Sequence, residues 1–109
     1  MSTRDFSSSQ EKHIAKVFKG RITPNSGGTK FGGGDVLTND FLIEAKTSMG
    51  PKQSFSIKKE WLYKAKEQAF EQGKSNYMLA FQFEPNGKNY YVIEENLAKQ
   101  LIDYLQEEE

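Results

Sequence analysis

The chain has no cysteine among its 109 residues. A disulfide framework and a thiolate-bound metal site are therefore both excluded. The sequence also lacks any apolar run near the roughly 20 residues that a membrane-spanning helix needs. No apolar segment near the N-terminus is typical of a signal peptide. We therefore expect a soluble, unexported, cytoplasmic protein with no membrane partner.

Net charge is also lacking, because 15 lysines and arginines balance 15 aspartates and glutamates. The balance hides an asymmetry. Residues 1–74 carry thirteen basic against eight acidic side chains, and residues 75–109 carry two against seven. The basic part could contact phosphate groups, and the acidic end could repel non-specific DNA. A solvated surface with unevenly placed charges explains the same pattern equally well.

What the chain does contain is enough apolar material for a folded core. Hydrophobic residues make up 36% of the sequence and aromatic residues 13%, which is inconsistent with disorder. A length of 109 residues suits one domain. There is no internal repeat and no long linker, so we expect a single domain over residues 1–109.

Three segments have the apolar spacing of amphipathic helices. The first is expected at about residues 8–19, with an N-cap from Ser7–Ser9 and a stop at Gly20. The second is expected at about residues 57–72, with Ser56 as its cap and Gly73 at its end. The third is C-terminal. The apolar residues that define the three helices are Ile14, Val17, Phe18, Trp61, Leu62, Ala65, Ala69, Leu97, Leu101, Ile102 and Leu105.

Short strands are predicted between these helices, and Asn86-Gly87 is a strong hairpin signal between the last two strands. The resulting order is helix, three strands, helix, two strands, helix. It predicts an α/β (mixed α+β) domain whose central mixed sheet is flanked by helices. The expected strands lie at about residues 21–23, 35–38, 41–47, 76–83 and 89–93.

Polar residues interrupt the two strands predicted in GDVLTNDFLIEAKTS, residues 34–48. Asn39 and Asp40 tolerate left-handed backbone, so we expect the turn there. A two-residue or four-residue loop then places Asp35 directly opposite Glu44, on one face of the sheet. A three-residue loop would break this register. Two opposed carboxylates repel each other, and a divalent cation between them is the simplest compensation.

Lys46 lies on the same strand as Glu44, and together with the two acids it forms a possible catalytic group. Side chains alternate along a strand, so Glu44 and Lys46 share a face about 7 Å apart. Carboxylate oxygens suit Mg²⁺, for which Mn²⁺ substitutes. Lys46 could then orient a water, aid its deprotonation or stabilise charge on a phosphate. The alternative is a pair of solvated acids with a lysine partner.

Asp35 followed by Glu44-Ala45-Lys46 resembles the PD-(D/E)xK nuclease motif, although Gly34 stands at the proline position. The segment from residue 10 to residue 48 is similar to the front half of small archaeal- and phage-type Holliday junction resolvases. The resemblance covers about residues 8–83. It implies a restriction-endonuclease-like sheet and a Mg²⁺-dependent endonuclease that resolves four-way DNA junctions by paired phosphodiester hydrolysis. If the chain is phage-encoded, its location is the host cytoplasm.

The resemblance also implies roles for individual residues. Asp35 and Glu44 match metal ligands that also act in catalysis, and the carbonyl of Ala45 matches a further ligand. Lys46 matches the catalytic lysine. Ser26 matches a serine near the scissile phosphate.

Glu11 matches a first-helix glutamate that binds the metal or its water and contributes to catalysis. It has a second interpretation, because Ser8-Ser9-Gln10-Glu11 is a capping-box sequence. Glu11 also lies on the same helical stripe as Ile14 and Phe18, which are expected to face the core. A metal-site glutamate needs that direction, whereas a capping glutamate does not.

Basic residues near this region are candidate DNA contacts: Arg21, Lys30, Lys58, Lys59 and Lys66. Contacts to phosphates would make binding salt-dependent and insensitive to base sequence. Solvated helix faces are the alternative. The glycine-rich loop, residues 24–34, is either a clamp that approaches a DNA strand or a flexible surface loop. His13 is expected at the surface or in helix packing, and Gln68 near the site.

A small chain with one site needs a second copy to cut two strands of a branched DNA, so we expect a C₂ homodimer. Three other functions stay open. One is a nuclease with the same motif that acts on flaps, nicks or duplex DNA. Another is a DNA-binding module without catalysis, and the third is an inhibitor or structural phage protein.

Overall fold

The order of helices and strands is as predicted. The computed structural model describes residues 3–23 and 35–107. No helix in this described part is long and apolar enough to cross a bilayer. The elements are α1 (Thr3–Phe18), β1 (Arg21–Ile22), β2 (Asp35–Leu37), β3 (Phe41–Lys46), α2 (Lys59–Glu71), β4 (Asn76–Phe81), β5 (Tyr90–Val92) and α3 (Glu95–Glu107).

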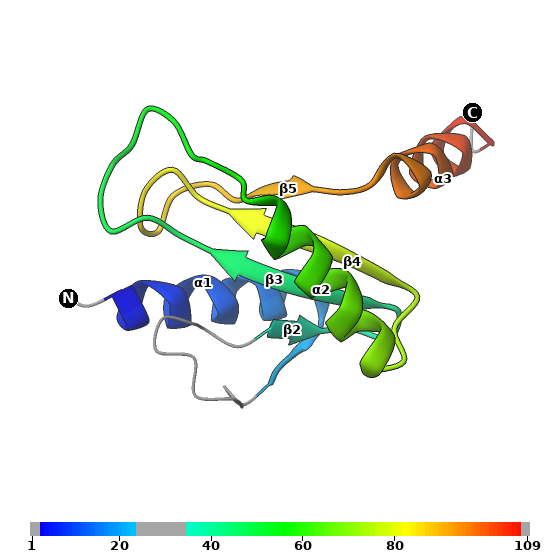
Figure 1. Ribbon diagram of the computed structural model, residues 1–109, viewed down its shortest axis with the longest axis horizontal. Coiled ribbons are helices and arrows are strands. Elements are labelled where there is room, and N and C mark those ends of the chain that lie inside the picture. The colour runs from blue at the N-terminus through cyan, green and yellow to red at the C-terminus, as the bar shows by residue number, and fades with distance from the viewer. Residues whose placement is uncertain (1–2, 24–34, 108–109) are drawn as a thin grey trace.

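A mixed sheet forms the centre of the molecule, with its five strands in sequence order. The β3–β4 pair is parallel because α2 crosses over between the two strands, and the other neighbours are antiparallel. Helices α1 and α2 lie on opposite faces of the sheet (Figure 1). The predicted mixed sheet flanked by helices is confirmed.

Strand alternation divides the core into two clusters. On the α1 face, Ile14 packs with the strand residues Val36, Ile43 and Ala45. On the α2 face, apolar residues of the same two strands pack against the helix. This second cluster consists of Leu37, Leu42, Ala65, Ala69 and Tyr77. Residues that alternate with the first cluster along β2 and β3 therefore lie on the side of the sheet that α2 covers.

The predicted start of the first helix is wrong, because α1 begins at Thr3 and not near residue 8. Serine is a moderate helix former as well as a good cap, so the run Ser7–Ser9 does not fix the start. Glu11 therefore lies inside the helix, and its interpretation as a capping-box residue is excluded. After the helix end, Lys19 adopts a positive φ of 56°, and the Gly20 N–H donates to the Ala15 carbonyl at 2.9 Å.

Helix α2 begins without the predicted cap. Its N-cap residue is Lys58, which makes no side-chain capping bond, so the prediction for Ser56 is wrong. Its C-terminal end is as predicted, with Gly73 at φ +72° just after the last turn. The N–H groups of Gly73 and Lys74 donate to the carbonyls of Phe70 and Ala69, the pattern of a Schellman motif.

The β4–β5 connection is longer than a two-residue hairpin. The strands are antiparallel neighbours, as expected, but residues 82–89 join them. Within this connection the Gly87 N–H donates to the Glu84 carbonyl, and Asn86 has a positive φ of 61°. The turn is therefore centred on Pro85 and Asn86, one residue before the predicted position, because proline favours the first central place of a β-turn.

The C-terminal helix α3 forms as predicted, but most of its apolar face stays uncovered. Of its apolar residues, Leu97 in the first turn is buried. Leu101, Ile102, Tyr104 and Leu105 are between 45% and 63% exposed. In Figure 1, α3 stands away from the sheet and from the other two helices.

Candidate active site

The turn between β2 and β3 sets the register of the site. The Thr38 N–H donates to the Phe41 carbonyl, and the Phe41 N–H donates to the Thr38 hydroxyl, so Asn39 and Asp40 form a two-residue loop. Neither loop residue has a positive φ. The turn is where it was predicted, although it does not use the left-handed backbone on which that prediction relied. The resulting register pairs Asp35 directly with Glu44.

Asp35 is held at the start of β2 by Thr23, which follows β1. The Thr23 N–H donates to the Asp35 carbonyl at 2.9 Å, and the Asp35 N–H donates to the Thr23 hydroxyl at 3.0 Å. The backbone of Asp35 is therefore fixed on both sides, by Thr23 and by the antiparallel pairing with β3. A fixed backbone keeps its carboxyl group on the α2 face, opposite Glu44.

The Asp35 carboxyl group is electrostatically unfavourable in its ionised form. Burial is the largest cause, followed by a hydrogen bond with the Glu44 side chain and by the charges of Glu44 and Glu11. The positive charge of Lys46 acts in the opposite direction. Together these effects raise the pKa of Asp35 from 3.8 to about 9. Without a cation, this carboxyl therefore keeps its proton at neutral pH.

Glu11 approaches the pair from α1. Its side chain is only 4% exposed, and its charge contributes to the raised pKa of Asp35. Glu11 lies one turn before the fully buried Ile14, on the same stripe of the helix. The charge of Glu11 thus reaches Asp35 although α1 covers the other face of the sheet (Figure 1), and the catalytic role of Glu11 stays a prediction.

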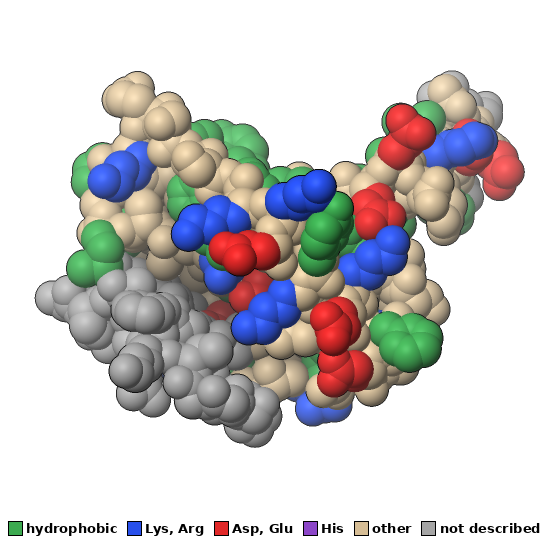
Figure 2. Space-filling view, viewed as in Figure 1, with side chains coloured by type: hydrophobic (Ala, Val, Ile, Leu, Met, Phe, Trp, Pro, Cys, Tyr) green, Lys and Arg blue, Asp and Glu red, His purple; other side chains and the backbone are tan. Residues whose placement is uncertain are grey.

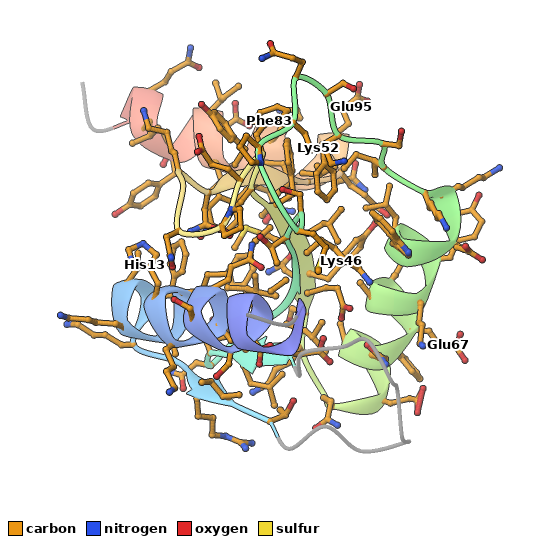
Figure 3. All side chains as sticks on the ribbon, turned by 90° about the vertical axis from the view of Figure 1, so that its left-hand side faces the viewer. His13, Lys46, Lys52, Glu67, Phe83 and Glu95 are labelled. Carbon is orange, nitrogen blue, oxygen red and sulfur yellow. The ribbon has the colours of Figure 1, made fainter. Side chains whose placement is uncertain are left out.

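Lys46 lies between a carboxylate and an aromatic ring. Its Nζ is 3.5 Å from Glu44 Oε1 and 4.5 Å from the centre of the Trp61 ring. The Lys46 and Glu44 side chains are 28% and 22% exposed, so both are partly shielded and still reachable from solvent. Figure 3 shows Lys46 on the side of the sheet that faces α2, with His13 on the opposite side of the molecule.

An aromatic cluster supports Trp61 beside Lys46. Phe55 contacts Trp61 and stacks on Phe81 at 5.1 Å, and Phe81 in turn contacts Phe83 and Tyr90. The sequence predicted Trp61 only as part of the apolar face of its helix. It did not reveal that Trp61 covers the lysine. A tryptophan in the first turn of the helix after the Glu-x-Lys strand was the available signal.

Gln10 is a second residue that the sequence did not single out. It is 2% exposed, and its amide donates to the Lys46 carbonyl at 2.9 Å and to Asn89 Oδ1 at 3.0 Å. It therefore ties α1 to the end of β3 and to the β4–β5 connection. No pattern of residue spacing marks such a contact, because it joins three segments far apart in the chain.

Asp35 and Glu44 are the two opposed acids available to a metal ion in this site. Within residues 3–23 and 35–107, no three Asp, Glu or His side chains form a complete ligand set. Asp35 and Glu44 are nevertheless directly opposed, and Mg²⁺ commonly uses one or two carboxylates and keeps several waters. Ala45 lies between the two functional positions of β3, with its side chain in the core on the α1 face. Two opposed carboxylates, one of them with a raised pKa, fit a small divalent cation.

The remaining predicted site residues are Ser26 and the candidate DNA contacts, and they lie in different parts of the chain. Ser26 and Lys30 lie outside the described residues. Arg21 in β1 and Lys59 at the start of α2 are exposed. Lys58 is also exposed, and its Nζ is 5.8 Å from the centre of the Trp61 ring, so it lies next to the site. Basic side chains are spread over the α2 face, with carboxylates among them (Figure 2).

Three other residues considered in the sequence have no described contact with Asp35, Glu44 or Lys46. Lys66, in the second half of α2, pairs with Glu94 at 3.3 Å and is not brought to Lys46. His13 is exposed on α1, as expected. Gln68 is half-buried in α2, and its side-chain oxygen is buried without a hydrogen-bond partner among the described residues.

Comparison of the chain with family models, with curated proteins and with solved structures finds no match in any of the three. The identification of the candidate site is therefore supported by its geometry and by the resemblance of its motif alone.

Proposed function

We propose that this protein is a Mg²⁺-dependent, structure-selective DNA endonuclease that resolves four-way junctions. The observation that carries the proposal is the direct pairing of Asp35 with Glu44 beside Lys46, on a partly buried face of the sheet. A binding module has no need for two opposed acids, which cost stability when no cation is bound. In metal-dependent hydrolysis, such a pair holds the ion.

Mg²⁺ held by Asp35 and Glu44, with the Ala45 carbonyl as a further ligand and Glu11 binding a metal-bound water, would neutralise the acids and supply Lewis acidity at the scissile phosphate. The chain's own residues would prepare this site. Thr23 and the β2–β3 register fix the direction of the Asp35 carboxyl. The expected products carry a 5′-phosphate and a 3′-hydroxyl, as the motif resemblance implies.

Lys46 would stabilise the negative charge that develops on the phosphate oxygens during in-line attack. Its ammonium group is confined by Glu44 on one side and by the Trp61 ring on the other. Confinement reduces the entropy that Lys46 would lose when it orients toward a phosphate, because a free lysine side chain has many rotamers.

DNA would lie along the α2 face. Arg21, Lys58 and Lys59 are exposed, with Lys58 beside Trp61, and would contact phosphates. Such contacts respond to backbone shape and not to base identity, so selectivity would come from the geometry of the branch. Binding should weaken steeply as salt increases.

The test compares labelled four-way junction, duplex and single-stranded DNA, each with Mg²⁺ or with a chelator. We expect paired nicks in the junction alone, lost with chelator and in Asp35→Asn. The matched control is Asp40→Asn, which removes an exposed carboxylate from the same hairpin and should cut normally.

Other outcomes assign other functions. Equal cleavage of duplex would indicate a nuclease that does not select junctions. Junction binding without cleavage in any divalent cation would indicate a binding module. Cleavage that persists with chelator, or in Asp35→Asn, would refute the proposed mechanism.

A further inference from the structure

The exposed apolar face of α3 has no part in the proposed nuclease site. Leu101, Ile102, Tyr104 and Leu105 lie within two turns of one helix and are all exposed. A helix of 13 residues is about 20 Å long, so these side chains form one continuous patch. Contiguous apolar patches on a folded chain mark contact surfaces more often than isolated exposed residues do.

A second exposed apolar surface lies on α2. Phe70 is 85% exposed and Tyr63 is 62% exposed, and they are seven positions apart, so they share one side of the helix. Beside Phe70, a hollow of about 320 Å³ opens between the end of α2 and the start of α3. Its lining includes Lys66, Ala69, Phe70, Lys74, Leu97 and Gln100.

Helix α3 of the same chain leaves this surface open. Leu97 anchors the first turn of α3, and Glu94 just before it accepts hydrogen bonds from Tyr77 and Lys66. From this anchored start the helix runs away from the rest of the molecule (Figures 1 and 2). With its start held in this way, α3 leaves Tyr63 and Phe70 of its own chain exposed.

We infer that α3 of a second copy docks onto this surface, so that two chains exchange their C-terminal helices around a twofold axis. Leu101 and Leu105 of each copy contact Phe70 of the other and fill the hollow beside it. In such an isologous interface, both exposed surfaces are buried, and the assembly is complete with two copies.

Charge selects this arrangement over direct pairing of the two α3 helices. Residues 95–109 contain five acids and one lysine, so two such helices repel each other. Residues 58–74 contain five lysines and three acids. Lys66, Lys74 and Glu94 line the hollow, and Glu94 pairs with Lys66, so the acidic helix of a second copy meets a net positive charge there.

The oligomeric state of the full chain tests the inference directly. By light scattering and sedimentation, we expect the wild type to be a dimer. Phe70→Asp and Leu101→Asp should each weaken dimerisation at least tenfold and keep the wild-type circular dichroism spectrum, because both residues are exposed in the single chain. Val17→Asp is the matched control, since Val17 is a similarly exposed apolar residue on α1 and should leave the dimer intact.

The absence of natural cysteine allows a second test by disulfide cross-linking. Phe70→Cys protein mixed with Leu101→Cys or Leu105→Cys protein should form cross-linked dimers several times faster than any of the three variants alone. A monomeric wild type would overturn the inference, and so would preferential cross-linking of Leu101→Cys to itself. Neither test requires nuclease activity, so dimerisation and cleavage can fail independently.

Discussion

Replacing Asp35 with asparagine should stabilise the metal-free protein at neutral pH while it removes the proposed activity. In the folded chain the pKa of Asp35 is raised to about 9, first by burial and then by Glu44 and Glu11. In the unfolded chain the same carboxyl has its usual pKa of 3.8. Between these two values the folded state binds a proton that the unfolded state has released. The stability that this carboxyl contributes is therefore present below pH 3.8 and is lost as the pH rises toward 9.

The size of the effect follows from linkage. For one proton, stability changes by about 1.4 kcal/mol per pH unit inside this window. Between pH 5 and pH 7 the wild type should lose about 3 kcal/mol relative to Asp35→Asn. For a domain of this size, such a loss corresponds to a difference of roughly 10–20 °C in melting temperature.

Thermal melts at several pH values, with chelator present throughout, measure this difference. Asp35→Asn should gain stability relative to the wild type as the pH rises, and the exposed control Asp40→Asn should follow the wild type. Parallel melting curves for wild type and Asp35→Asn would refute the reasoning. They would mean that the Asp35–Glu44 pair is solvated and has no need of a cation.

Three further predictions follow from the same geometry. Mg²⁺ at about ten times its dissociation constant should stabilise the wild type by about 1.4 kcal/mol at pH 8 but leave Asp35→Asn unchanged, as thermal melts with and without Mg²⁺ would show. Trp61→Leu should lower the cleavage rate about fivefold, because a partly shielded cation–π contact to Lys46 is worth about 1 kcal/mol, and Trp61→Phe should recover most of the rate. An unchanged rate in Trp61→Leu would show that the ring does not position the lysine. Gly20→Ala should destabilise the fold by about 1–3 kcal/mol in urea titrations, since its Cβ would lie 2.7 Å from the Leu37 carbonyl oxygen.

Local sequence patterns predicted most of the fold. The alternation of Val36 with Leu37, and of Leu42 with Ile43, identifies two strands with two buried faces, and both clusters are present. Helix starts were predicted less well. Ser7–Ser9 and Ser56 are good capping residues, but capping preference is worth only about 1 kcal/mol, and other local and tertiary interactions outweigh it.

The site was predictable where it depends on local geometry alone. Asp35 and Glu44 meet because a two-residue turn fixes their register, which the sequence between them indicates. Trp61 and Gln10 also contact Lys46, yet both come from helices whose position against the sheet depends on packing. No spacing within the chain encodes that position.

In β2 and β3, the residues that stabilise the fold and the residues proposed for catalysis lie at different positions. On the α2 face, Leu37 and Leu42 pack under the helix near the β2–β3 turn, and Asp35 and Glu44 follow two residues farther from the turn. At that level the other face stays apolar, because Ala45 packs in the cluster under α1. The unfavourable carboxyl pair can therefore exist without disrupting the sheet. Neutral variants of either acid should fold, which makes loss of cleavage in them attributable to chemistry and not to unfolding.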